Sequence, residues 1–245
     1  MKLDYKIYGV YKRQQWMEDY KKVLPISDSD LIYDDRPNGG NAYYTCRKAW
    51  LEPVPEGVTH RFCLPDDIKL CKDFISLVQK VIEAHPDKMI CLFPFDYSLY
   101  GKNVELIGSP YYQTNIATCC GVIMPVNMIE DCFSWIDEHY HDKDAIIDDE
   151  AMQDYGSCKG IKNITTIPSL VQHIGDVSLI TPEAPARRTQ FFIDDLENYD
   201  VDWSSQEVKW IPLSDYNKTK MIGGKRVDYR RRYIVPEKYK LRRPQ

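Results

Sequence analysis

The sequence predicts an α/β protein with a mostly parallel central sheet, flanked by helices and followed by an irregular C-terminal extension. Two observations carry this prediction. Short apolar runs with strand character alternate with longer segments whose apolar residues recur with helical spacing. One of these runs, residues 58–64, leads into the adjacent carboxylates Asp66 and Asp67. Such an ending is typical of a buried strand that delivers polar groups to the carboxyl edge of a parallel sheet.

The first part of the chain is predicted to consist of repeated strand–helix units. The predicted strands are residues 3–10, 31–33, 58–64 and 89–95, and the predicted helices are residues 12–24, 42–51 and 72–84. Between the second strand and the second helix, Pro37, Gly39 and Gly40 are too close together for regular structure. This alternation indicates a largely parallel sheet with helices on both faces.

The later part of the chain is less regular. It contains predicted strands at 104–107, 117–124 and 161–167, a helix at 126–140, a helical turn at 151–155, and a loop at 168–175. After about residue 182, prolines and polar residues indicate a boundary. We therefore expect a main domain over residues 1–182 and an extension over residues 183–245 that packs on it.

Composition limits the class of protein. The chain has 245 residues, of which 43% are hydrophobic, and it can bury a full core. It has no apolar run of about 18 residues and does not begin with a signal peptide, so we expect a cytoplasmic protein without a transmembrane segment. The eight cysteines have no metal-binding CxxC spacing and are expected to be reduced core residues.

The end of the chain is strongly basic. Residues 217–245 contain eleven Lys and Arg against two acids, a local charge of +9 in a chain of net charge −5. Tyrosines are interleaved with the basic residues, a mixture suited to phosphates and to stacking. The alternative is a tail that packs on the acidic body. The candidate nucleic-acid-binding residues are Arg230, Arg231, Arg232, Lys240, Arg242 and Arg243.

The acidic pair has two interpretations. Two adjacent aspartates on a solvated loop are good ligands for a hard divalent cation, which could in turn hold a diphosphate. Alternatively, one of them caps the helix that follows. A cleft at the sheet edge favours the first interpretation.

Three segments together resemble a known family. They are HRFCLPDDIKLCKDF at residues 60–74, DDEAMQDY at 148–155 and IPSLVQHIG at 167–175. This arrangement resembles the nucleotide-sugar-dependent glycosyltransferases of GT-A fold, including small members encoded by bacteriophages, and it covers roughly residues 3–180. The family's metal motif is Asp-any-Asp, whereas this chain has Pro65-Asp66-Asp67, and that departure concerns the metal more than the fold.

The resemblance implies roles for the donor site. Asp67 would hold Mn²⁺ or Mg²⁺ on the diphosphate of a nucleotide-sugar such as a UDP-sugar, and Asp66 would contact the ribose or the sugar. His173 would be a further metal ligand, with an ordinary loop histidine as the alternative. A cation there would neutralise the departing nucleoside diphosphate.

The remaining donor contacts are expected at the second strand and nearby. Asp34 and Asp35 would hold the base or the ribose, and Arg13 or Lys48 would face phosphate. The alternatives are helix capping and ordinary surface charge.

The second acidic segment is expected to serve the acceptor. An inverting transferase needs a carboxylate that takes the acceptor's proton, and Asp149 is the first candidate, with Asp148 next to it. The alternative is that these acids only favour the start of a helix. Retaining enzymes of this fold lack a dedicated base, so the stereochemistry stays open.

Other functions remain open at this stage. They are a nucleic-acid-binding module with a silent α/β body and a nucleotidyltransferase, although the first strand lacks the Gly-rich phosphate loop of the latter. Some phage enzymes of the family glycosylate hydroxymethylated bases in DNA, and the basic tail would suit such a polyanionic acceptor in a host cytoplasm.

Overall fold

The computed structural model divides the chain into two compact units, Met1–Ile211 and Pro212–Gln245. It describes residues 1–36, 42–94, 107–114, 120–140, 142, 146–175, 188–189, 191–197, 200–210, 219–222 and 225–228. The first unit extends beyond the boundary expected after residue 182, because residues 191–210 contribute core side chains, including Phe192 and Trp203, and one strand of the main sheet.

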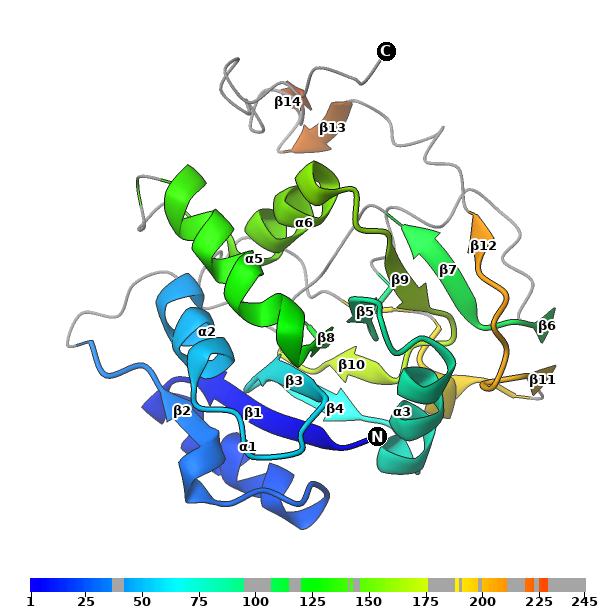
Figure 1. Ribbon diagram of the computed structural model, residues 1–245, viewed down its shortest axis with the longest axis horizontal. Coiled ribbons are helices and arrows are strands. Elements are labelled where there is room, and N and C mark those ends of the chain that lie inside the picture. Colours follow the sequence, from blue (N-terminus) through cyan, green and yellow to red (C-terminus); the bar gives the residue numbers. More distant parts are fainter. Residues whose placement is uncertain are drawn as a thin grey trace. The chain divides into compact units, whose positions relative to one another are not determined.

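The first unit is built on a sheet of eight strands, in the order β12-β7-β9-β5-β8-β3-β1-β2 (Figure 1). Along the chain these strands are β1 (Leu3–Gly9), β2 (Leu31–Tyr33), β3 (His60–Pro65), β5 (Ile90–Cys91), β7 (Tyr111–Thr114), β8 (Val122–Pro125), β9 (Asn163–Thr166) and β12 (Lys209–Trp210).

The predicted α/β fold is confirmed, and the sheet is mixed. Four of its strand pairs are parallel, namely β1–β2, β1–β3, β5–β9 and β7–β12. The other three, β3–β8, β5–β8 and β7–β9, are antiparallel. The apolar run of β8 looks the same in either direction, so periodicity alone could not predict that it runs against both of its neighbours.

The order of the first three strands creates a place for a ligand. The chain goes from β1 to β2 on one side and then returns to β3 on the other side of β1, and all three strands point the same way. In open α/β sheets, the carboxyl ends of strands at such a reversal form a crevice that binds ligands. Here the crevice lies after Gly9 of β1 and Pro65 of β3.

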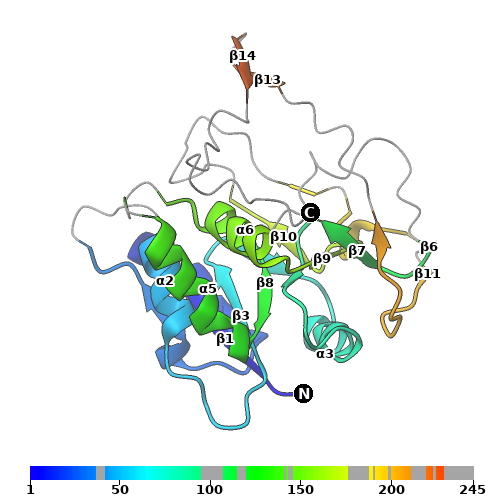
Figure 2. The ribbon, with the colours of Figure 1, turned by 45° about the horizontal axis from the view of Figure 1, so that its top comes forward.

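Helices cover both faces of the sheet. One core cluster contains side chains of α1 (Gln14–Asp19) and α3 (Phe74–Ala84), and the other contains side chains of α2 (Ala42–Leu51), α5 (Val126–His139) and α6 (Asp148–Lys159). Figures 1 and 2 show α2, α5 and α6 together as one group, apart from α3. Helix α6 is longer than the turn expected at 151–155.

A buried ion pair fastens β3 to β1 and to the end of α2. The side chain of Arg61 is fully buried and lies 2.6 Å from Oδ2 of Asp4. Its guanidinium also donates to the carbonyl oxygens of Trp50, Glu52 and Pro53. A buried arginine is stable only with such partners, so this network keeps the strand that carries the acidic pair in register.

Shorter elements complete the fold. Strands β4 (Ile68–Leu70) and β10 (Val171–His173) pair antiparallel, and β6 (Ile107–Gly108) pairs with β11 (Asp200–Val201). In the second unit, β13 (Thr219–Ile222) and β14 (Lys225–Asp228) form an antiparallel pair. In the part of the chain that the structure describes, the single-turn 3₁₀ segments are Tyr11–Arg13, Tyr20–Lys22, Asp28–Asp30 and Ile193–Asp195. None of the helices in the described ranges has the length and apolar character needed to cross a membrane.

Candidate functional site

The acidic pair lies in the turn between β3 and β4, at the predicted crevice. Asp66 and Asp67 are buried, with relative exposures of 4% and 7%. The expectation of a solvated loop is therefore wrong. The turn is covered because Arg13 and Tyr20, from the segment after β1, and the loop after β10 form hydrogen bonds with it. These residues do not cap α3, whose N-cap is Asp73.

Arg13 joins the two carboxylates. Its Nη1 atom lies 2.8 Å from Oδ1 of Asp66 and 2.7 Å from Oδ2 of Asp67. The second oxygen of Asp66 accepts a hydrogen bond of 3.0 Å from the backbone N–H of Val10. The segment after β1 therefore supplies both the cation and a backbone donor to the acids that follow β3.

His173 reaches the same cluster from another part of the chain. The antiparallel pairing of β10 with β4 places His173 opposite Ile68, the residue after Asp67. Its Nε2 atom lies 3.2 Å from Oδ2 of Asp67, and the N–H of Ile174 donates to the carbonyl oxygen of Asp67 at 2.8 Å. Among the described residues, the buried Nδ1 atom of His173 has no hydrogen-bond partner. The predicted meeting of Asp67 with His173 is present in the structure.

Two glycines let the backbone approach the carboxylates closely. A Cβ atom on Gly9 would lie 2.2 Å from Oδ2 of Asp66, and one on Gly175 would lie 2.9 Å from Oδ2 of Asp67. Sequence reasoning missed both. The sequence does show that each glycine lies at the end of a predicted strand or loop, close to a candidate site residue. It does not show which distant side chain lies against the glycine.

The two aspartates of the cluster differ in the direction of their pKa shifts. Burial raises the pKa of Asp66 above its ordinary value, although the hydrogen bonds from Arg13 and Val10 oppose this. Burial also acts to raise the pKa of Asp67, but hydrogen bonds and charge from His173 and Arg13 outweigh it, and this pKa is lowered. The two carboxylates likewise raise the pKa of Arg13 against the effect of its burial. Asp67 is thus the more firmly ionised aspartate.

The end of β2 lies beside this cluster through a backbone link, since the N–H of Asp34 donates to the carbonyl oxygen of Gly9 at 2.8 Å. The carboxylate of Asp34 pairs with Arg36 at 2.7 Å, and this hydrogen bond lowers its pKa. Asp35 and Lys48 pair with each other at 3.2 Å. Two of these predicted donor residues, Asp34 and Asp35, therefore lie directly after β2, and the third, Lys48, lies in the last turn of α2.

A pair of tyrosines, also missed by sequence reasoning, lies at the same edge. Tyr11, which follows β1, and Tyr33, which ends β2, stack with ring centroids 4.5 Å apart and an interplanar angle of 6°. Tyr11 is 62% exposed. Its outer face can stack on a planar ligand such as a base.

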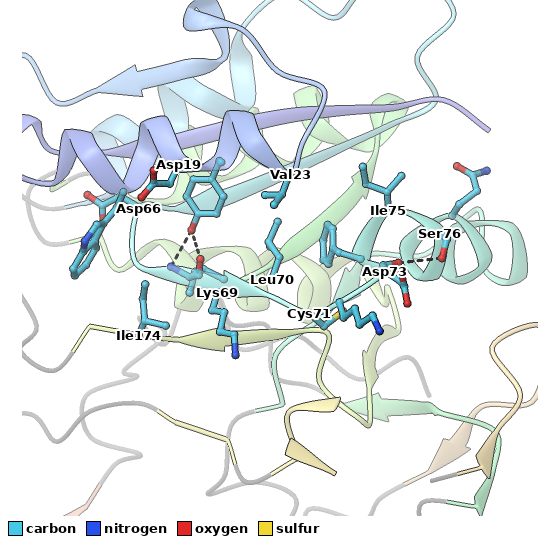
Figure 3. Close-up of a pocket in the computed structure, with 16 residues that line it drawn as sticks. Asp19, Val23, Asp66, Lys69, Leu70, Cys71, Asp73, Ile75, Ser76 and Ile174 are labelled. Carbon is cyan, nitrogen blue, oxygen red and sulfur yellow. Dashed lines mark hydrogen bonds between the residues drawn. The ribbon is translucent and has the colours of Figure 1, made fainter. Parts of the chain in front are cut away.

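A pocket of about 910 Å³ opens beside Asp66. Figure 3 shows Asp66 at one end of it and Asp73 with Ile75 and Ser76 at the other, with Val23 and Leu70 between them. Its lining also includes Trp16 and Ile174, the residue after His173. The volume falls within the range of small-molecule sites, which is about 300–1,000 Å³.

Asp148 and Asp149 form the first turn of α6 together with Glu150. The N–H of Asp149 donates to Oδ1 of Asp148 at 3.0 Å, and the N–H of Glu150 donates to Oδ1 of Asp149 at 2.9 Å. These contacts are those of acids at a helix start, where the dipole favours them. Their assignment to the acceptor stays a prediction.

The tail candidates Arg230, Arg231, Arg232, Lys240, Arg242 and Arg243 lie outside the described residues.

The donor atoms of the cluster fit a divalent cation in part. Oδ2 of Asp67 and Nε2 of His173 are close enough to bind one ion, but Arg13 already bonds to that oxygen. Within the described residues, no group of three or more His, Cys, Asp or Glu could hold a metal by itself. Mg²⁺ commonly binds through one or two carboxylates completed by substrate phosphates, and this cluster offers ligands of that kind.

Comparisons with known proteins do not assign a function. No protein-family model matches the chain, and no curated protein matches it. Among solved structures, the chain is similar to A197 from STIV, with 12% sequence identity and a TM-score of 0.39, over 82% of this chain and 100% of A197. A likeness this weak carries no argument about the site.

Proposed function

We propose that this protein is a glycosyltransferase that moves a sugar from a nucleotide-sugar donor to an acceptor hydroxyl. One observation carries the proposal: Arg13, Asp66, Asp67 and His173 meet at the carboxyl ends of β1 and β3, where the strand order reverses. The same residues are donor-site candidates through the GT-A resemblance of the sequence. Charged groups converging on a crevice beside a pocket are typical of a binding or active site.

The donor is proposed to lie across the strand ends. Its base would stack on Tyr11, with Asp34 and Asp35 near the base or ribose, and its diphosphate would lie at the Arg13 and Asp67 cluster. A guanidinium binds phosphate oxygens through parallel hydrogen bonds, which suits Arg13 to this role. The pocket beside Asp66 would give room for the sugar and the acceptor.

If the transfer inverts the sugar, the chemistry requires charge neutralisation on one side of the sugar and proton removal on the other. Positive charge at the diphosphate stabilises the nucleoside diphosphate as the glycosidic bond breaks. Mn²⁺ or Mg²⁺ held by Asp67 and His173 would supply Lewis acidity there. Asp149 is the proposed base that accepts the proton of the acceptor hydroxyl.

The acceptor is proposed to be a nucleic acid, such as DNA with hydroxymethylated bases. The support is the +9 charge of residues 217–245, because a polyanion is attracted to Lys and Arg. A cytoplasmic location is part of the same proposal. No disulfide joins any two of the seven described cysteines, and a reducing compartment keeps cysteines in that state.

The proposal is tested by titrating the protein with a panel of UDP- and GDP-sugars by calorimetry, with Mn²⁺ present. We expect one donor class to bind, and the Tyr11→Ala variant to bind that donor more weakly, because base stacking contributes about 1–3 kcal/mol. A matched control is Tyr44→Ala, which removes an exposed tyrosine that contacts Arg36. Binding of no nucleotide-sugar would contradict the proposal.

A further inference from the structure

Arg13 occupies the position between the two carboxylates where a bound cation would be expected. One nitrogen, Nη1, contacts an oxygen of each aspartate, at 2.8 and 2.7 Å. The oxygen of Asp67 that it contacts is the one that His173 also reaches, at 3.2 Å. A metal ion bound to Asp67 and His173 through this oxygen would lie next to the guanidinium, and two cations so close repel each other strongly.

We propose that Arg13 is the resident counter-ion of the acidic pair, and that a divalent cation binds Asp67 only after Arg13 has moved away. This inference rests on the proposed glycosyltransferase function and adds a control on its metal site. The free protein then binds the metal weakly, and the site becomes competent when an anionic donor arrives.

The burial of the pair explains why a resident counter-ion is needed. The side chains of Asp66 and Asp67 are only 5% and 10% exposed, and that of Arg13 is 14% exposed. Buried carboxylates that lack a positive partner are strongly destabilising. Arg13 therefore keeps the empty site folded, and whatever displaces it must bring positive charge of its own.

A diphosphate that arrives with its divalent cation can draw Arg13 off the aspartates, because the cation replaces the positive charge that Arg13 takes away. Guanidinium groups bind phosphate oxygens bidentately, and Nη1 of Arg13 is shared between two carboxylates here. The carbon atom of the guanidinium lies 5.2 Å from the ring centroid of Trp16, which is 39% exposed and lines the pocket beside Asp66. Arg13 makes this contact while it is paired with the acids, and the ring can keep the contact as the guanidinium turns toward the pocket.

The exchange makes the two ligands cooperative. The diphosphate favours the position of Arg13 that frees Asp67, and the metal on Asp67 favours the same position because it repels Arg13. Each ligand therefore raises the affinity for the other by an equal factor.

The test is calorimetric titration of the full chain with Mn²⁺, without a sugar donor, in the wild type and in Arg13→Gln. We expect the variant to bind Mn²⁺ at least about tenfold more tightly, since it lacks the competing charged hydrogen bonds. Arg13→Lys, which keeps a positive charge, should stay near the wild type. The control Arg36→Gln removes an arginine that pairs with Asp34 and should also match the wild type. Equal or weaker binding by Arg13→Gln overturns the proposal.

Inorganic pyrophosphate provides a second measurement. The affinity of pyrophosphate for Mn²⁺ is first measured without protein and subtracted. The remaining gain in Mn²⁺ affinity that pyrophosphate causes should be larger for the wild type than for Arg13→Gln. An equal gain in both overturns the proposal. If Arg13→Gln is unfolded without metal, recovery of its circular dichroism with millimolar Mn²⁺ supports the proposal, and failure to recover overturns it. Neither measurement uses a nucleotide-sugar. Their results can therefore be interpreted even if the protein is shown not to be a glycosyltransferase.

Discussion

A Cβ atom on Gly9 would lie 2.2 Å from Oδ2 of Asp66, so β1 ends in a residue that leaves room for the carboxylate of another strand. The contact is accompanied by the hydrogen bond from Val10 N–H to the same oxygen, at 3.0 Å. The end of β1 and the turn after β3 are therefore shaped for each other. Any side chain at position 9 must displace Asp66.

We expect Gly9→Ala to move Asp66 and to weaken donor binding, with a loss of about 1–3 kcal/mol in stability from overpacking. Calorimetry with the donor and urea unfolding measure the two effects. The matched control is Gly57→Ala, where the φ angle of +74° makes alanine unfavourable but a Cβ would meet no atom within 4 Å. That variant should be destabilised while keeping donor affinity. If Gly9→Ala binds the donor with wild-type affinity, the contact between Gly9 and Asp66 does not contribute to donor binding.

The burial of Asp67 changes what its substitution should do. A solvated loop carboxylate could be replaced with almost no change in melting temperature. Asp67 instead accepts hydrogen bonds from Arg13 and His173, so Asp67→Asn should lower the free energy of unfolding by about 1.5–3 kcal/mol, the range for bonds to charged groups. Urea unfolding at neutral pH checks this. A variant as stable as the wild type would mean that the cluster does not form in solution.

Asp149→Asn tests the proposed base. If Asp149 takes the acceptor's proton, turnover should fall at least about 100-fold while donor affinity is kept. Asp148→Asn is the matched neighbour, since both residues lie in the first turn of α6, and it should keep most of the activity. Equal losses in the two variants would favour a role in starting the helix, and lost donor binding would move Asp149 to the donor site.

The basic tail should govern binding to nucleic acid. Replacing Arg230, Arg231 and Arg232 by Gln in the full chain should weaken DNA binding and lower its salt slope by about 0.9 for each lost phosphate contact. The control replaces three exposed lysines of the first unit that do not line the pocket beside Asp66, namely Lys80, Lys159 and Lys162. Filter binding at several salt concentrations measures both. Unchanged affinity and slope in the arginine variant would rule out the tail as a DNA contact.

Much of the fold was accessible from sequence because local patterns determine the elements. Strand 31–33 and helix 42–51 were predicted with the bounds that the structure shows. The short pair β4–β10 was not predicted, since each strand has three residues and its partner lies about a hundred residues away. Such pairing depends on tertiary contacts, which a single sequence does not display.

The site was predicted only in part, because it too depends on contacts between distant segments. Asp67 and His173 were expected together through a resemblance, and they are in contact. Arg13 was expected to face phosphate, and its role as the partner of both aspartates was missed. Its charge and position after β1 are visible in the sequence, but nothing local shows that it reaches across to the end of β3. Burial of Asp66 was missed because the chain that covers it comes from distant segments.

The central claim is that the Arg13, Asp66, Asp67 and His173 cluster binds and activates a nucleotide-sugar. The most direct measurement is the release of nucleoside diphosphate from the donors that bind, with Mn²⁺ present, by the wild type and by Asp67→Asn at a temperature where both are folded. The account predicts release by the wild type and a loss of at least about 100-fold in the variant, because the variant lacks the carboxylate that would hold a cation on the leaving group. Equal rates of release, or none from any donor by the wild type, would contradict it.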